Sequence, residues 1–264
     1  MTEWLFGPAS MSWRINRESI LILGGRGALL MQLAHPSVAQ GVSDHSSFPA
    51  DAVARLRRTL ALMRAITFGD VATAERVVGG ISRVHDRVRG ERADGVPYFA
   101  RDPRLLLWVF ATLVDSSARV YHWYVHPLSE EERERYYQES KAVARLFGVP
   151  DELIPRTLGE LEDWVAQLVT SGEVVVTPPA LRLAAGVLRP LPFIPRRLGT
   201  ASAVVTAMLL PEPIRVGYGL SLGPARRALF QVSRRASRSI VPRLPDAVRS
   251  FGVPRRVSEM TPQG

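Results

Sequence analysis

Two features of the sequence, its hydrophobic periodicity and its helix start and stop signals, predict an all-α fold. Apolar residues recur about every 3.6 positions along most of the chain, and few segments alternate polar and apolar residues as strands do. Residues that commonly begin or end helices lie between these apolar stretches. The chain has 264 residues, of which 46% are hydrophobic, enough for a sizeable core. We therefore expect one helical domain over residues 1–264, with its core at about 15–190 and a basic helical part at about 196–264.

The first expected helix, over residues 20–34, is strongly apolar. It should end near His35, because Pro36 pushes the residue before it out of the α region. The segment Gly-Gly-Arg-Gly at residues 24–27 has the spacing of neither a dinucleotide-binding loop nor a P-loop, and no clear strand precedes it. Close packing of this helix against a neighbour explains these small residues better than phosphate binding does.

A helix with a cationic face is expected between Asp51 and about Thr67. Asp51 has the side chain of an N-cap, and Phe-Gly-Asp at residues 68–70 should end the helix. Its positions i, i+3, i+4 and i+7 share one face and are occupied by Arg55, Arg58, Thr59 and Leu62.

The next expected helix runs from about residue 71 to 89 and carries His85. Valine and isoleucine recur on one of its faces with the spacing of an amphipathic helix, and Gly90 should end it. His85 lies at the edge of this apolar stripe, which consists of Val77, Ile81, Val84 and Val88.

Start and stop signals define the remaining helices. These are a helix over about residues 105–124, opened by Asp102-Pro103 and ended by His126-Pro127; a helix from the capping box of Ser129 and Glu132 to about Phe147; and a helix over about 158–171. We also expect a loop around Thr177-Pro178-Pro179 and a boundary at the prolines of residues 190–195, before the basic part.

The chain contains no cysteine, which restricts its metal chemistry. Disulfides, zinc–thiolate sites, cysteine-ligated iron–sulfur clusters and thiol nucleophiles are excluded. Histidine, carboxylate or other oxygen donors must therefore hold any redox metal.

The N-terminal residues lack the pattern of a signal peptide, and no apolar run reaches the roughly 20 residues of a membrane span. We expect a cytoplasmic protein, either in solution or peripheral at a membrane.

The positive charge of the chain lies in its C-terminal third. Residues 181–264 hold fourteen arginines against three acidic residues, a net charge of +11, so the first 180 residues carry −2 of the chain's +9. A basic segment of this kind can bind nucleic acid, an anionic membrane or anionic cofactor groups. Nucleic acid is not expected, because no known reader motif is present. We therefore expect the basic segment to form a solvated or membrane-facing surface. The chain has a single lysine, Lys141, which indicates a compositional bias toward arginine.

Several catalytic motifs are absent, incomplete or out of their usual context in this sequence. The pentapeptide Gly-x-Ser-x-Gly at residues 219–223 follows no strand, and every histidine precedes its serine, opposite to the order in α/β-hydrolases. The paired Glu-x-x-His motifs of a di-iron bundle are absent. His122 and His126 have the i, i+4 spacing of metal ligands but lack the intervening glutamate of a zinc protease, so a structural role is favoured for both.

His85 is the leading candidate for a site. On its pattern alone it could be a half-buried helix histidine paired with a neighbouring aspartate or carbonyl group. A haem, however, requires one axial imidazole, an apolar slot and cations for its propionates. His85, the apolar stripe beside it, and the face of Arg55, Arg58 and Thr59 provide these three features.

A set of motifs resembles one known family. The motifs are residues 33–46, Leu-Ala-His-Pro-Ser-Val-Ala-Gln-Gly-Val-Ser-Asp-His-Ser; Arg55-x-x-Arg58-Thr59; Val84-His85-x-x-Val88-x-Gly90; the segment at 108–116; and Pro127-Leu128-Ser129 ahead of Tyr136-Tyr137. Together they resemble the MpaB-like oxygenase family, which includes the catalytic domain of the bacterial rubber oxygenase, latex clearing protein. The resemblance covers about residues 5–220.

The resemblance implies a globin-like helical bundle with extra helices that binds haem b. His85 would be the axial ligand of the iron, and Arg55 and Thr59 would line the distal pocket. Arg58 would stand where rubber oxygenase has lysine, and because arginine stays charged it cannot ligate iron as a neutral lysine can. A distal carboxylate base is also implied, for which Asp44 and Asp51 are the nearby candidates. His35 and His45 are expected to cap and brace helices.

By this resemblance the protein would be a haem-dependent oxygenase. It would act on an apolar small molecule of the isoprenoid or lipid class, with O2 on the face opposite His85. An alternative is a non-catalytic haem- or lipid-binding helical module at a membrane surface. A third interpretation, suggested by Arg58, is a structural helical protein whose ancestral site has decayed.

Overall fold

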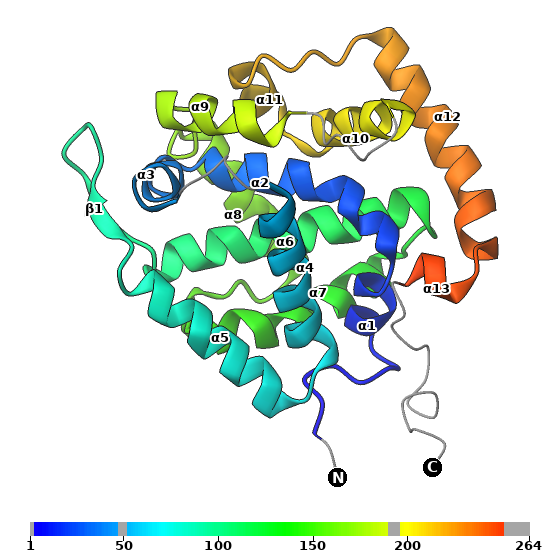
Figure 1. Ribbon diagram of the computed structural model, residues 1–264, viewed down its shortest axis with the longest axis horizontal. Coiled ribbons are helices and arrows are strands. Elements are labelled where there is room, and N and C mark those ends of the chain that lie inside the picture. Colours follow the sequence, from blue (N-terminus) through cyan, green and yellow to red (C-terminus); the bar gives the residue numbers. More distant parts are fainter. Residues whose placement is uncertain (1–2, 47–51, 190–195, 251–264) are drawn as a thin grey trace.

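The computed structural model describes residues 3–46, 52–189 and 196–250, and helices make up most of this part of the chain (Figure 1). The predicted all-α class is therefore confirmed. The α-helices are α1 (Met11–Asn16), α2 (Gly25–Leu33), α3 (Pro36–His45), α4 (Ala52–Phe68), α5 (Val71–His85), α6 (Pro103–Tyr124), α7 (Glu130–Leu146), α8 (Leu158–Thr170), α9 (Pro178–Val187), α10 (Arg196–Leu209), α11 (Glu212–Gly217), α12 (Pro224–Ile240) and α13 (Asp246–Arg249). The other elements are the 3-10 segments η1 (Ser19–Gly24), η2 (Asp151–Leu153) and η3 (Val241–Arg243), and an antiparallel hairpin of β1 (Arg89–Glu91) and β2 (Pro97–Phe99).

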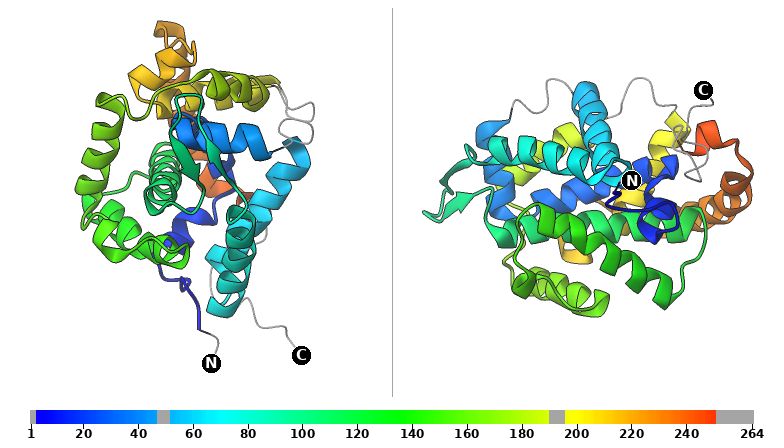
Figure 2. Two further views of the ribbon diagram at one scale, coloured as in Figure 1. Left: turned by 90° about the vertical axis from the view of Figure 1, so that its left-hand side faces the viewer. Right: turned by 90° about the horizontal axis from the view of Figure 1, so that it is seen from below.

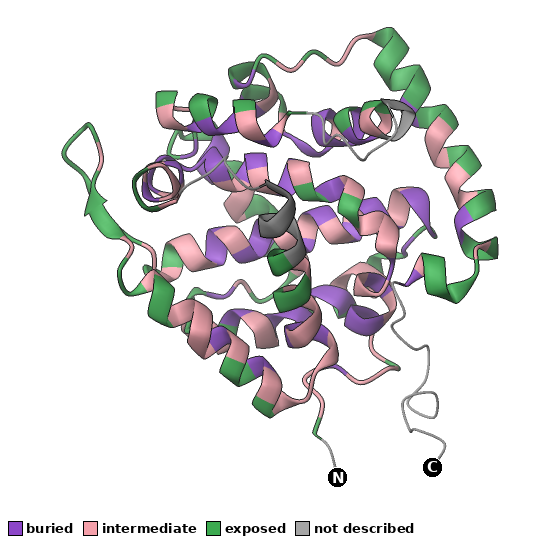
Figure 3. Cartoon of the chain, in the orientation of Figure 1, coloured by how far each residue is buried: buried purple, intermediate pink, exposed green. Residues whose placement is uncertain are grey.

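Helix α6 lies at the centre of the fold. It contacts α1, α2, α7, α8, α10 and α12, and buried residues follow one another along most of its length (Figure 3). Trp108, which is fully buried, donates a hydrogen bond from its indole nitrogen to the carbonyl oxygen of Gln32 at 3.3 Å. Burial of such a large ring joins α6 to α2, and the indole N–H keeps a partner inside the core.

The hairpin of β1 and β2 projects from one side of the helical body, and α12 runs along the opposite side (Figures 1 and 2). In the described part of the chain, no helix combines the length and the hydropathy that a membrane span requires.

The glycines near the start of α2 permit close helix packing, as the sequence predicted. A Cβ atom at Gly24 would lie 2.8 Å from Val120 of α6, and one at Gly27 would lie 2.6 Å from Leu209 of α10. The prediction of one helix over residues 20–34 was wrong, because residues 19–24 form a 3-10 segment and the α-helix begins only at Gly25.

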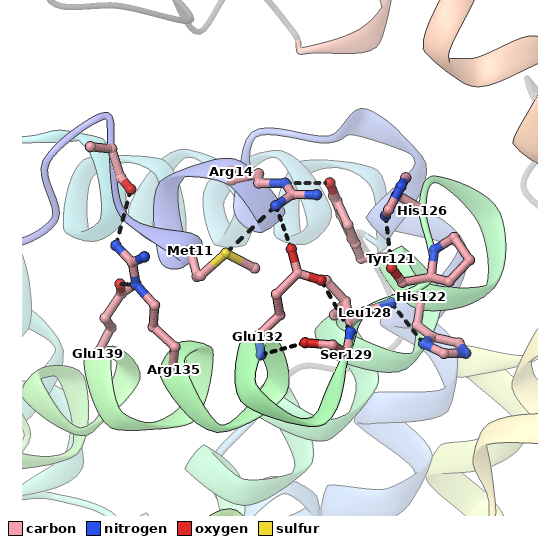
Figure 4. Close-up of polar contacts among 12 residues, drawn as sticks. Met11, Arg14, Tyr121, His122, His126, Leu128, Ser129, Glu132, Arg135 and Glu139 are labelled. Atoms are coloured by element: carbon pink, nitrogen blue, oxygen red, sulfur yellow. Dashed lines mark hydrogen bonds and ion pairs between the residues drawn. The ribbon is translucent and has the colours of Figure 1, made fainter.

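The predicted limits of α6 and α7 are confirmed. Asp102 caps α6 through a hydrogen bond from the backbone N–H of Arg104 to its carboxylate, at 2.8 Å. Ser129 and Glu132 form both bonds of the capping box of α7, and Glu132 also binds Arg14 of α1 (Figure 4). This arrangement satisfies donors at the start of α7 and fixes α1 against it.

Two predicted boundaries were wrong. Helix α5 ends at His85 rather than near Arg89, because the chain turns there and Val88 accepts a hydrogen bond from Ala100 at the base of the β hairpin. The three-residue strands are too short to leave an alternating pattern in the sequence. The segment around Pro178, expected as a loop, opens α9, since proline at the first helical positions needs no hydrogen-bond partner.

Helices α4 and α5 pack against each other and are joined by Gly69 and Asp70. The Asp70 carboxylate caps α5 by accepting a hydrogen bond from the backbone N–H of Thr73 at 2.8 Å. From this link the two helices diverge, α5 toward the β hairpin and α4 toward α2 and α3 (Figure 1). The predicted N-cap Asp51 and the boundary at residues 190–195 lie outside the described residues.

Candidate functional site

His85 is the last residue of α5 and is half-buried. Asp86 follows it as the C-cap, and the chain then enters the hairpin. The side chain therefore lies at the end of α5 that is far from the link to α4.

Burial is the main cause that lowers the pKa of His85, and the positive charge of Arg101 lowers it further. The carboxylate of Asp86 acts in the opposite direction. The imidazole is therefore neutral at neutral pH, which is the form that binds metals.

The other four histidines each use a ring nitrogen in a hydrogen bond within the fold. These bonds join His35 Nδ1 to the backbone N–H of Ser37 (3.2 Å), His45 Nε2 to the carbonyl oxygen of Arg89 (3.1 Å), His122 Nδ1 to the backbone N–H of Leu128 (3.1 Å) and His126 Nδ1 to the carbonyl oxygen of Pro127 (2.7 Å). His35 thereby caps α3 and His45 braces α3 against β1, as the sequence led us to expect. Figure 4 shows that His122 and His126 bond to different backbone groups, consistent with the structural roles predicted for them.

His85 differs from these four. Among the residues that the structure describes, none forms a hydrogen bond with its ring. The imidazole is thus neutral, sheltered and not engaged in bracing the fold. A ring in this state can act as a ligand without the loss of a structural hydrogen bond.

The structure describes part of the cationic face that was predicted on α4. Arg58 and Thr59 lie on α4 and are exposed, and the side chain of Arg55 lies outside the described residues. No described hydrogen bond joins Arg58 or Thr59 to His85. That this face of α4 forms part of the His85 site therefore stays a prediction.

Arg101 is a charged residue near His85 that the sequence reasoning missed. It forms an ion pair with Asp86 at 3.1 Å and acts on the His85 ring through its positive charge. Arg101 follows β2, sixteen positions after His85, and only the hairpin returns the chain to the end of α5. Helical spacing could not have linked the two residues.

Asp44, a candidate for the distal carboxylate, is bound to Tyr98. The hydroxyl of Tyr98 donates a hydrogen bond to Oδ2 of Asp44 at 2.6 Å, and burial together with this bond raises the pKa of Tyr98 to about 12. Asp44 thus holds α3 against β2. The other candidate, Asp51, lies outside the described residues.

The described residues contain no cluster of three or more histidine, aspartate or glutamate side chains that could hold a metal ion. A haem iron is held by its porphyrin and needs only one protein ligand, so a lone imidazole such as that of His85 is a sufficient donor.

A separate pocket of about 590 Å³ lies along α6 and α8, beside the end of α10. Its wall is mostly apolar, with Ala118, Leu161 and Val165 among the lining residues, and His122 lies at its polar edge. His85 is not part of its lining. The pocket is therefore distinct from the surroundings of His85, and its residues come from helices too far apart in sequence for any motif to reveal it.

Residues 13–239 match the family model described as ER-bound oxygenase mpaB/B'/rubber oxygenase, catalytic domain. The chain is also 28% identical over 131 residues to uncharacterized proteins of Mycobacterium bovis and Mycobacterium tuberculosis. The alignment covers 48% of this chain and 51% of each relative, so the chain spans about half the length of the curated relatives it matches. No solved structure matches it. Since the family model covers most of the chain, the protein belongs to the mpaB and rubber oxygenase family and carries its oxygenase catalytic domain.

Proposed function

We propose that the protein is a haem b-dependent oxygenase that acts on an apolar substrate, with His85 as the axial ligand of the iron. This proposal rests on a difference in hydrogen bonding between His85 and the other four histidines. Four hold hydrogen bonds within the fold, whereas His85 is half-buried, has a lowered pKa and bonds to no other described residue through its ring. Membership of an oxygenase family makes a metal ligand the simplest use of such a ring.

The residues around His85 fit a haem in their chemistry. A bound haem would supply the redox-active iron and would bring two anionic propionates to the site. Arg101 beside His85 and Arg58 on the neighbouring helix are cations that could neutralise such groups. Val84, which precedes His85 on α5, provides exposed apolar surface at this end of the helix.

Arg58 and Thr59 have a role in this proposal that differs from ligation. The guanidinium of Arg58 stays protonated and can only donate hydrogen bonds, and the hydroxyl of Thr59 can donate or accept one. Together with Arg55 they would orient polar atoms on the side opposite His85. The iron would then have one ligand from this chain.

The family supports a proposal for the substrate class. The family name includes rubber oxygenase, and rubber is an apolar hydrocarbon polymer. We propose an apolar substrate of the isoprenoid or lipid class, since water exclusion favours oxygen chemistry at a buried centre.

Oxygen uptake tests the proposal. The full chain is purified after haem supplementation and mixed with squalene, an apolar polyene, in an oxygen electrode. Uptake by the wild-type protein and its loss in His85→Ala, with His126→Ala unchanged, is the expected result. Haem binding without uptake of oxygen with any apolar alkene would instead favour the non-catalytic haem- or lipid-binding module.

A further inference from the structure

Several polar side chains of helix α12 face the protein beside the buried Phe230. The hydroxyls of Ser233 and Tyr124 hydrogen-bond at 3.0 Å, and the hydroxyl of Ser237 donates to the carbonyl oxygen of Tyr124 at 2.8 Å. The guanidinium of Arg238 donates to the carbonyl oxygens of Trp123 and His122 at 3.1 and 2.7 Å. These bonds satisfy the carbonyl groups at the end of α6 and fix the orientation of α12.

An outer face of α12 is apolar and exposed. Leu229, Val232 and Ile240 leave 41%, 63% and 57% of their surface to solvent. Their spacing, with Ala236 between the last two, places them on one side of the helix. Figure 3 shows this helix exposed along the edge of the molecule. Because Phe230 already packs this helix on the core, the exposed aliphatic side chains are not needed for that contact, and the outer face of α12 has the character of a contact surface.

The positive charge around this outer face favours an anionic partner. Residues 213–245 contain seven arginines and no acidic residue. Arg226 and Arg235 are exposed on α12 itself, and Arg243 is exposed just beyond it. Two copies of this surface would repel each other, whereas an anionic surface would be attracted.

We infer that the outer face of α12 docks on an anionic lipid bilayer. Leu229, Val232 and Ile240 would enter the boundary between headgroups and acyl chains, and the arginines would meet the lipid phosphates. Nucleic acid offers phosphates but no apolar layer for the three aliphatic side chains. The proposal does not depend on haem or on His85.

Co-sedimentation of the full chain with vesicles tests the inference. Binding to phosphatidylcholine vesicles that contain phosphatidylglycerol, weakening as salt is raised, is expected, with little binding to pure phosphatidylcholine. The double variant Leu229→Ser/Val232→Ser should bind roughly tenfold more weakly, since apolar surface no longer enters the bilayer. Val175→Ser, which changes an exposed valine outside α12, is the matched control and should bind as the wild type does.

A second pair of variants tests the charge. Arg226→Gln and Arg235→Gln should each weaken binding about fivefold, and Arg182→Gln on α9 should leave it unchanged. Circular dichroism checks that each variant is folded. Equal binding to neutral vesicles, binding by the outer-face variants as tight as the wild type's, or a dimer in solution that Val232→Ser dissociates would overturn the inference.

Discussion

The Nδ1 atom of His35 accepts a hydrogen bond from the backbone N–H of Ser37 at 3.2 Å. The imidazole thereby takes the place that serine or aspartate usually has at the start of a helix. His35 is buried, and burial together with the charge of Arg92 lowers its pKa to about 4. Only the neutral ring has a lone pair at Nδ1 to accept this bond.

His35 should make the protein less stable as the pH falls from about 6.5 to about 4. In this window the unfolded chain binds a proton at His35 and the folded chain does not, so protons favour unfolding. The loss in the free energy of unfolding should be roughly 3 kcal/mol. His35→Asn keeps a capping side chain without titration, so urea unfolding at both pH values should show a smaller loss. His126→Asn, on an exposed ring, should keep the wild-type loss; equal losses in wild type and His35→Asn would contradict the assignment.

Arg249→Gln should lower the free energy of unfolding by about 3 kcal/mol. The guanidinium of Arg249 pairs at 2.7 Å with Glu18, whose side chain is 3% exposed, so the variant leaves a buried carboxylate without its counterion. Arg145→Gln breaks an exposed pair with Asp151 and should cost less than about 1 kcal/mol. Urea unfolding measures both. Similar losses in the two variants would show that burial of Glu18 does not matter.

Gly27→Ala should destabilise the protein by roughly 1–3 kcal/mol, because the new methyl group would overlap Leu209 of α10. Gly25→Ala is the matched control, since a Cβ atom there meets nothing within 4 Å. The control should leave stability unchanged or raise it slightly, as alanine restricts the unfolded chain. Thermal unfolding compares the two. A stable Gly27→Ala variant would contradict the close contact between α2 and α10.

Arg58→Lys should change the absorption spectrum of the haem-loaded protein at alkaline pH, if α4 lines the side opposite His85. A lysine amine can ligate iron once it is neutral, whereas arginine cannot, so the wild-type spectrum should lack this transition. Arg76→Lys, on the exposed surface of α5, should behave as the wild type does. A spectrum of Arg58→Lys that matches the wild type at every pH would remove Arg58 from the site.

Most helix limits could be predicted because their signals are local. The capping box of Ser129 and Glu132 and the cap at Asp102 act within a few residues, and both are present in the structure. The end of α5 could not be predicted, because tertiary pairing of β1 with β2 overrides the helical pattern up to Arg89. The orientation of α12 also depends on the distant carbonyl groups of α6, which no local pattern reveals.

Only the central residue of the candidate site, His85, could be predicted from the sequence. His85 was found from its position at the edge of an apolar stripe and from a resemblance. Spacing alone does not distinguish it from His35 or His122, because the difference lies in hydrogen bonds that form only in the folded chain. Arg101 was missed for the same reason, since the hairpin brings it back to the end of α5.

Titration of the full chain with hemin tests the role of His85 most directly. The wild type should bind one equivalent and develop a Soret band, and His126→Ala should do the same. His85→Gly should bind hemin more weakly with a shifted band, and added imidazole should restore the wild-type spectrum by replacing the missing ring. A His85→Gly variant whose spectrum and affinity equal those of the wild type, or a wild type that binds no hemin, would contradict the assignment of His85 as the axial ligand.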